Sequence, residues 1–159
     1  MSGNVNYAIP TGVWTKDNGI VIVPPGNSWA GNDSNPKVNP LTLADGSPNP
    51  NNIKGKNNIL QVDRHCIGPL PPGLYKVGEW AFTAEDIARL GYPTHLGLGI
   101  ASLIQIGGET YGRDGFFIHG PSKGDDYGQE SEGCTVVLHD FRLGKLAALQ
   151  PDTVTVTAA

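Results

Sequence analysis

A histidine and a cysteine with glycine neighbours are the side chains of this sequence that point most directly to chemistry. His119 lies in the stretch "GFFIHG" and is followed by Gly120, while Cys134 ends the stretch "SEGC" and is preceded by Gly133. A glycine beside a reactive side chain indicates that the backbone conformation matters at that point. If both residues stand at the ends of neighbouring strands, they face each other across a groove.

The chemistry expected of such a pair is acyl transfer through a thioester. An unperturbed cysteine has a pKa of about 8.5, so only about 3% of it is thiolate at pH 7. A neighbouring imidazole raises that reactive fraction. The backbone N–H groups of Gly133 and Cys134 would stabilise the oxyanion of a tetrahedral intermediate, and the loss of one such donor typically costs about 10²–10³ in rate.

The sequence alone leaves other interpretations of these residues open. His65 and Cys66 form a rival pair, although adjacent residues on a strand point to opposite faces. A metal site built from the histidines and cysteines would lack the ligand spacing of known sites. The two cysteines, Cys66 and Cys134, either form a disulfide that closes a long loop or remain as thiols.

Composition predicts one β-rich domain over residues 1–159. The chain has 22 glycines and 13 prolines, and so many turn-forming residues favour short strands joined by ordered loops. Charged residues make up 16% and the net charge is -4, which is not the pattern of a nucleic-acid-binding protein. No stretch approaches the roughly 18 apolar residues of a membrane-spanning helix.

The elements that must position the pair are mostly strands. The "DNG" at residues 17–19 predicts a tight hairpin turn between two short strands. In residues 82–91, Thr83 can cap a helix and Gly91 can end it. The predicted fold class is therefore mainly β with one or two short helices. Further strands are expected at residues 74–80, 96–106, 115–118, 134–138 and 152–159, and a second short helix at residues 139–151.

Residues 26–58 form a long stretch that is rich in Asn, Gly, Pro and Ser and has little periodicity. A loop of this length is unusual in a compact domain. It is either a flexible surface excursion or a lid or wall over a binding groove.

Three motifs in a fixed order resemble those of one family. The segments "GPLPPGLYKVG" (68–78), "GRDGFFIHG" (112–120) and "SEGCTVVL" (131–138) are similar to segments of L,D-transpeptidase-like antibacterial effectors delivered by type VI secretion. These effectors are a short branch of the enzymes with a YkuD-type catalytic domain. The resembling region runs from about residue 65 to the C-terminus. The resemblance implies an L,D-transpeptidase-like, β-rich catalytic domain that uses no cofactor and acts on peptidoglycan stem peptides.

The resemblance also assigns roles within the motifs. Cys134 would be the nucleophile and His119 the base, and Gly133 and Cys134 would form the oxyanion hole. The carbonyl of Gly120 or the side chain of Ser131 would orient the imidazole.

The chain departs from the housekeeping members of the family at two places. They carry histidine before Gly-Cys, where this chain has Glu132, and an arginine or asparagine just after the cysteine region, where it has only Thr and Val at residues 135–137. The arginines of this chain either supply the missing positive charge or serve a turn and a helix surface. The candidates for the substrate-binding groove are Arg113, Arg142, Tyr111 and Tyr127.

The expected activity is removal or exchange of the terminal D-alanine of tetrapeptide stems, or cross-linking of two stems. Because residues 1–26 lack the basic start and the long apolar run of a secretory signal, we expect a chain made in the cytoplasm and delivered by a secretion apparatus to the periplasm of a target bacterium. The expected partners are a secretion component and a cognate immunity protein. The alternatives are a non-catalytic β-rich binding module of a secretion or phage-like apparatus, and a cysteine endopeptidase on stem peptides.

Overall fold

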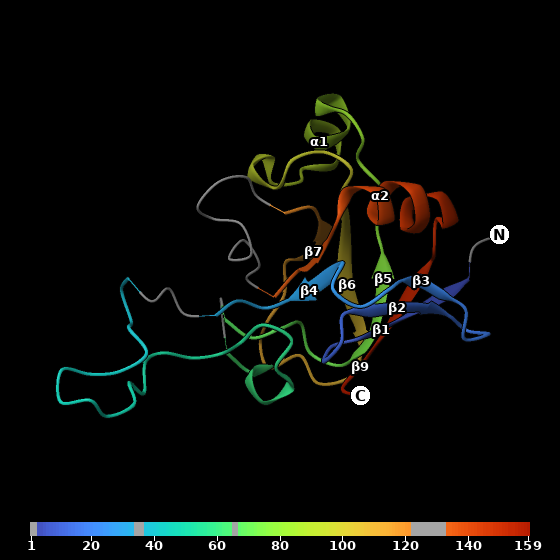
Figure 1. The fold of residues 1–159 in the computed structure, drawn as a ribbon. Coiled ribbons are helices and arrows are strands. Elements are labelled where there is room, and N and C mark those ends of the chain that lie inside the picture. Colours follow the sequence, from blue (N-terminus) through green and yellow to red (C-terminus); the bar gives the residue numbers. More distant parts are fainter. Residues whose placement is uncertain (1–2, 34–36, 65–66, 122–132) are drawn as a thin grey trace.

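The computed structural model describes residues 3–33, 37–64, 67–121 and 133–159. The strands are β1 (Asn4–Ala8), β2 (Val13–Lys16), β3 (Val21–Val23), β4 (Ser28–Ala30), β5 (Gly73–Val77), β6 (Ala101–Gly107), β7 (Phe116–His119), β8 (Thr135–Val137) and β9 (Thr153–Thr157). They form one sheet in the order β3-β2-β1-β9-β5-β6-β7-β8-β4 (Figure 1). The pairs β1–β9 and β7–β8 are parallel, and the other pairs are antiparallel. The prediction of a mainly β fold is confirmed.

The sheet curls around its main hydrophobic core. Trp14 of β2 donates its indole N–H to Ser28 Oγ of β4 at 2.9 Å, although these strands stand near opposite ends of the strand order. The main core lies inside this curl and includes the large side chains Tyr7, Trp14, Tyr75, Ile118 and Leu146. Strands β1, β5, β7 and β9 all direct side chains from one face into this core. Apolar residues on that face therefore alternate with polar residues on the other face of the predicted strands.

A second and smaller apolar cluster lies under the first helix. It consists of Ala81, Ile87 and Ile100, and we call it the α1 cluster. Phe117 packs against the α1 cluster, whereas its neighbours Phe116 and Ile118 belong to the main core. Strand β7 therefore separates the two clusters.

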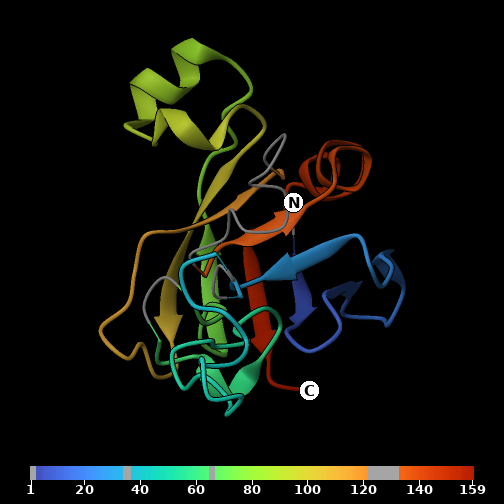
Figure 2. The ribbon, with the colours of Figure 1, turned by 60° about the vertical axis from the view of Figure 1, so that its left-hand side comes forward.

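Helices α1 (Ala84–Leu90) and α2 (His139–Phe141) are short and lie toward the same end of the sheet in Figures 1 and 2, whereas the helical turn near residue 60 lies toward the other end. In α1, Thr83 Oγ1 accepts from the Asp86 N–H at 3.1 Å and the Asp86 carboxylate accepts from the Thr83 N–H at 3.2 Å, while Gly91 ends the helix with φ +71°. The predicted cap and stop are thus confirmed. None of the described helices has the length and apolar character needed to cross a lipid bilayer. The other helical segments are η1 (Ile59–Gln61), η2 (Thr94–Leu96) and the π-helical η4 (Arg142–Ala147).

The strand predicted at residues 96–106 begins later than expected, at Ala101. Gly97 and Gly99 have φ values of +82° and +72°, which are incompatible with an extended strand. The apolar pattern of the stretch is real, but these two glycines turn the chain before β6 begins.

Part of the predicted loop at residues 26–58 is a strand. Strand β4 pairs antiparallel with β8, and its Trp29 lies opposite Val136. Farther along, Asp33 and Lys54 form an isolated bridge, and the intervening described residues extend away from the sheet (Figure 1). The stretch therefore contributes an edge strand next to the cysteine-bearing segment, which a composition argument could not reveal.

Candidate functional site

Strands β7 and β8 bring His119 and Cys134 to the same face of the sheet. Ile118 pairs with Thr135, and His119 pairs with Val136. Since Cys134 precedes Val136 by two residues, the side chains of His119 and Cys134 leave the same face. A strand spacing of about 4.8 Å and a rise of about 3.3 Å per residue put their Cα atoms about 8 Å apart on the diagonal. The two residues singled out in the sequence are thus neighbours in the fold.

This face is turned away from the main core. Phe116 and Ile118 point into the main core, so Phe117 and His119 point to the other side of β7. Cys134 belongs to neither apolar cluster, although only 8% of its surface is exposed. Cys134 is therefore a buried side chain that faces away from the main core.

The sulfur of Cys134 lies against the backbone of β7. The Phe117 N–H donates to Sγ with an N to S distance of 3.2 Å, and Sγ lies 4.0 Å from the carbonyl oxygen of Gly115. An N–H group directed at sulfur stabilises the thiolate relative to the thiol. Cys134 is present as a thiol, and Cys66 lies outside the described residues.

The imidazole of His119 is oriented by the backbone. Its Nδ1 lies 2.8 Å from the carbonyl oxygen of Gly120. Because a carbonyl oxygen can only accept, Nδ1 carries the hydrogen, and Nε2 of the neutral ring keeps the lone pair that a base needs. Gly120 is one of the two orienting groups that the resemblance implied; the other, Ser131, lies outside the described residues.

The imidazole nitrogen that would accept the proton, Nε2 of His119, makes no hydrogen bond to the described residues in this conformation. This nitrogen is buried and is not bonded to Cys134 Sγ. Catalytic hydrogen bonds are often long in the absence of substrate and tighten in the complex. A buried imidazole nitrogen without a partner costs free energy in the resting protein, which is typical of groups retained for function.

Burial lowers the pKa of His119, because the imidazolium loses solvation. The hydrogen bond to the Gly120 carbonyl acts in the opposite direction, and the positive charges of Arg142 and His95 lower the pKa further. The ring therefore stays neutral, and able to accept a proton, at pH values where an exposed histidine with a pKa near 6.5 is protonated.

Arg142 is the buried guanidinium beside this histidine. Its Nε donates to the Gly99 carbonyl at 3.0 Å, and its Nη1 donates to the Val137 carbonyl at 2.7 Å. A Cβ atom at Gly120 would lie 2.1 Å from Nη1, so the guanidinium fits only against a glycine. Arg142 thus ties β8 to the loop before β6 and fixes the residue that orients the imidazole. Its proposed contact with a substrate carboxylate stays a prediction.

Replacing Arg142 with methionine is expected to raise the pKa of His119, because a positive charge next to the ring is removed. The NMR titration of the His119 ring, and the acid limb of kcat/KM if the protein turns over, then move to higher pH. Arg142→Lys keeps the charge and is the matched control, with a smaller shift expected. If the titration of His119 is the same in Arg142→Met as in the unchanged protein, the guanidinium charge does not act on the ring.

Arg113 joins the three sequence motifs in space. Its Nη1 donates to the Pro69 carbonyl at 2.7 Å, and its Nη2 donates to the Gly68 carbonyl at 2.9 Å. A Cβ atom at Gly133 would lie 2.5 Å from Nη2, and the Gly133 carbonyl accepts from the Leu70 N–H at 2.9 Å. The proline-rich motif and the arginine of the second motif therefore hold the backbone that leads into β8.

The other predicted groove residues are Arg113, Tyr111 and Tyr127. Arg113 is only 4% exposed, is bonded to backbone carbonyls and also lines a pocket with Gly115 and Phe117, so its contact with a substrate stays a prediction. Tyr111 is exposed, and its N–H donates to the Glu109 carboxylate at 2.9 Å; no contact among the described residues joins it to Cys134. Tyr127 lies outside the described residues.

A pocket of about 310 Å³ is lined by residues of β6, of β7 and of the segment before β7, including Arg113. Its walls include Gly115 and Phe117, whose backbone groups contact Cys134 Sγ, together with Ser102 and Ile104 of β6. This volume is at the lower end of the range for small-ligand pockets. Neither Cys134 nor His119 is among its lining residues, so its connection to the sulfur runs through Gly115 and Phe117.

Two groups that act on this site were not identified from the sequence. The Phe117 N–H contacts the sulfur, and the charge of His95 acts on His119. Alternation along "GFFIH" places Phe117 and His119 on one strand face and could have indicated the first group. No sequence signal connects His95 to His119. Within the described ranges, no group of three His, Cys, Asp or Glu side chains could hold a metal ion.

Comparison with known proteins does not assign the chain to a family. No family model matches it, and neither curated proteins nor solved structures give a match. The resemblance of the three motifs therefore rests on the residues quoted above, and the family and activity that it implies are proposals.

Proposed function

We propose that this protein is a cysteine enzyme of peptidoglycan that acts on tetrapeptide stems as an L,D-carboxypeptidase and L,D-transpeptidase. The observation that carries the proposal is the placement of Cys134 and His119 on one face of β7 and β8, with Nδ1 of the imidazole bonded to Gly120 and Nε2 left to act as base. This arrangement fits the activation of a thiol by a neighbouring imidazole.

The first half of the reaction forms a thioester. Nε2 of His119 takes the thiol proton of Cys134, and Sγ attacks the carbonyl carbon of the diamino-acid residue. The backbone N–H groups of Gly133 and Cys134 stabilise the resulting oxyanion. When the C–N bond breaks, the imidazolium returns its proton to the leaving amine, and the terminal D-alanine departs.

The second half releases the acyl group. Water, a free D-amino acid or the amine of a second stem attacks the thioester carbonyl while His119 accepts a proton from it. The C–S bond then breaks, and the sulfur recovers a proton from the imidazolium. Water gives the shortened tripeptide stem, a D-amino acid gives exchange, and a second stem gives a cross-link. We favour the first two outcomes, because they remove substrates for wall synthesis.

We further propose that the protein is an antibacterial toxin delivered to the periplasm of a target bacterium, where a cognate immunity protein would block the site in kin cells. This part rests on the motif resemblance. Directing the chain to the periplasm of a test bacterium examines it separately from the chemistry: arrested growth that a Cys134→Ala variant does not cause supports the toxin role, and normal growth opposes it.

Product analysis by mass tests the enzymatic proposal. Purified protein is incubated with disaccharide-tetrapeptide muropeptides, with and without added D-methionine, and Cys134→Ala protein serves as the blank. We expect loss of D-alanine, and its replacement by D-methionine when that amino acid is present. Unchanged masses would favour a non-catalytic binding module, and cleavage of pre-formed cross-links without loss of D-alanine would favour an endopeptidase.

A further inference from the structure

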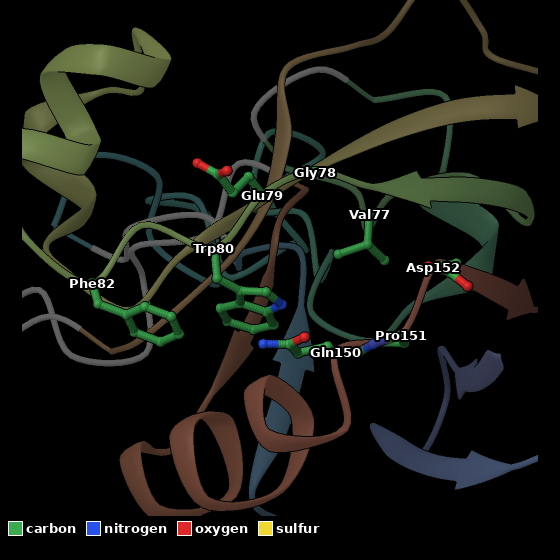
Figure 3. A pocket seen from close by; sticks show the side chains of 8 residues that line it. All are labelled: Val77, Gly78, Glu79, Trp80, Phe82, Gln150, Pro151 and Asp152. Carbon is green, nitrogen blue, oxygen red and sulfur yellow. The ribbon is translucent and has the colours of Figure 1, made fainter. Parts of the chain in front are cut away.

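A second groove lies away from the thiol, where the end of β5 meets the start of β9. It has a volume of about 470 Å³ and is lined by Glu79, Trp80, Phe82, Gln150 and Asp152, among others (Figure 3). Trp80 belongs to the main core, whereas Ala81 belongs to the α1 cluster that Phe117 contacts. The groove and the thiol therefore lie on opposite sides of the segment at residues 80–82, and the proposed acyl transfer makes no use of the groove.

Two aromatic rings form one wall of this groove. The Trp80 and Phe82 ring planes are within 11° of parallel, and their centroids are 6.3 Å apart. The rings lie side by side in Figure 3, as expected for residues two apart on an extended segment. Phe82 is 47% exposed and belongs to neither apolar cluster. Such high exposure is unusual for a phenylalanine side chain. Phe82 offers a flat apolar surface to a ligand, and Trp80, which is 8% exposed, backs it from the main core.

Hydrogen-bonding groups of both kinds surround that surface. The Trp80 indole N–H is buried and has no partner among the described residues, and Figure 3 shows its nitrogen on the ring edge next to Gln150. The amide of Gln150 can donate and accept, and the exposed carboxylate of Asp152 can only accept. The Glu79 carboxylate accepts from Arg89 at the rim. A buried donor without a partner, such as the Trp80 indole N–H, next to exposed polar side chains indicates a ligand-binding site.

The mixture of groups selects the chemical class of that ligand. A cationic side chain would suit the aromatic faces and the Asp152 carboxylate, but it has no acceptor for the Trp80 N–H. A pyranose has an apolar C–H face that packs on aromatic rings. Its hydroxyl and acetamido groups both donate and accept, so they can satisfy the indole, the Gln150 amide and the carboxylate together.

We propose that this groove binds a chain of pyranose sugar residues, with the exposed ring of Phe82 as the stacking surface, the buried indole N–H of Trp80 as a donor, and Gln150 and Asp152 as polar contacts. That the chain is the glycan of peptidoglycan rests on the proposed function of the thiol site. The groove would then hold the enzyme on the polymer whose stems it trims. Because the groove is separate from Cys134, sugar binding does not depend on turnover.

NMR of the indole groups tests this proposal. The ¹⁵N-labelled Cys134→Ala protein is titrated with the N-acetylglucosamine tetramer, so that binding is measured without chemistry. We expect a saturable shift of the Trp80 indole N–H signal, while the Trp14 indole N–H, which is bonded to Ser28 Oγ, stays in place. Phe82→Ala is expected to weaken binding about three- to tenfold through the lost ring contact. Leu60→Ala, at an exposed apolar side chain of η1, is the matched control without effect.

The possible results separate this proposal from the enzymatic one. No shift of the Trp80 signal with millimolar tetramer would overturn the proposal, as would equal affinity of Phe82→Ala and the parent. A shift caused by a lysine-rich peptide but not by the tetramer would overturn it in favour of a cationic ligand. None of these results changes D-alanine release by the unchanged protein, so the groove can fail while the thiol site stands, and the reverse.

Discussion

Cys134→Ala is expected to end D-alanine release, with a loss of at least about 10⁴-fold. The sulfur of Cys134 is the only protein atom proposed to form a covalent bond with the substrate. Removal of one member of a nucleophile–base unit typically lowers the rate by about 10⁴-fold or more. The side chain is buried and its sulfur accepts from the Phe117 N–H, so its truncation is expected to lower the thermal midpoint by roughly 2–6 °C, which leaves the protein folded for the assay. The measurements are the rate of D-alanine release and a thermal melt on the same sample.

The second cysteine of the chain provides the matched control. Cys66→Ala removes the other thiol, and the proposed mechanism gives that thiol no role. Its rate of D-alanine release is therefore expected to stay close to that of the unchanged protein. Activity that survives Cys134→Ala but disappears in Cys66→Ala would reverse the assignment and restore the rival His65–Cys66 pair.

Local chemistry decided which parts of the fold could be predicted. Helix α1 was correctly placed because Thr83, Asp86 and Gly91 determine its two ends within ten residues. The pairing of β1 with β9 joins Asn4 to Thr153, near the two ends of the chain, and no pattern within either strand specifies that partner. The alternation of β9 predicted a strand but left its neighbours unknown.

The candidate site, like the fold, has features that the sequence predicted and features that it did not. The glycines next to His119 and Cys134 were taken as signs of a backbone requirement. Gly133, with φ +119°, agrees with that expectation, whereas Gly120 has a packing reason that the sequence did not contain. Gly120 packs against Arg142, and Gly133 packs against Arg113. Each arginine is buried because its carbonyl acceptors come from distant loops.

These two arginines also show why charge alone does not identify a substrate contact. A charged side chain is normally expected at the surface. Arg113 reaches the carbonyls of Gly68 and Pro69, about 45 positions earlier in the chain, and Arg142 reaches Gly99. Such acceptors can be identified only after folding, so the sequence left a substrate role and a structural role open for both arginines. Their described contacts are with the framework.

Gly133→Ala is expected to damage both stability and activity. Gly133 has φ +119°, which an L side chain rarely adopts, and the new Cβ would lie 2.5 Å from Arg113 Nη2 and 2.6 Å from Phe116 Cε1. Neither neighbour can move easily, because Arg113 is bonded to the Gly68 and Pro69 carbonyls and Phe116 lies in the main core. Strain and overlap together are expected to cost about 2–4 kcal/mol, or a fall of roughly 5–15 °C in the thermal midpoint.

The same substitution is expected to lower the rate of D-alanine release by about 10²–10³, because it redirects the N–H group proposed for the oxyanion hole. Gly112→Ala is the matched control. Gly112 also has a left-handed backbone, with φ +69°, but no atom lies within 4 Å of the position of its Cβ. That variant should lose about 1 kcal/mol and keep its activity. Equal stability and equal rates for the two variants would show that the contact of Gly133 with Arg113 does not position the nucleophile.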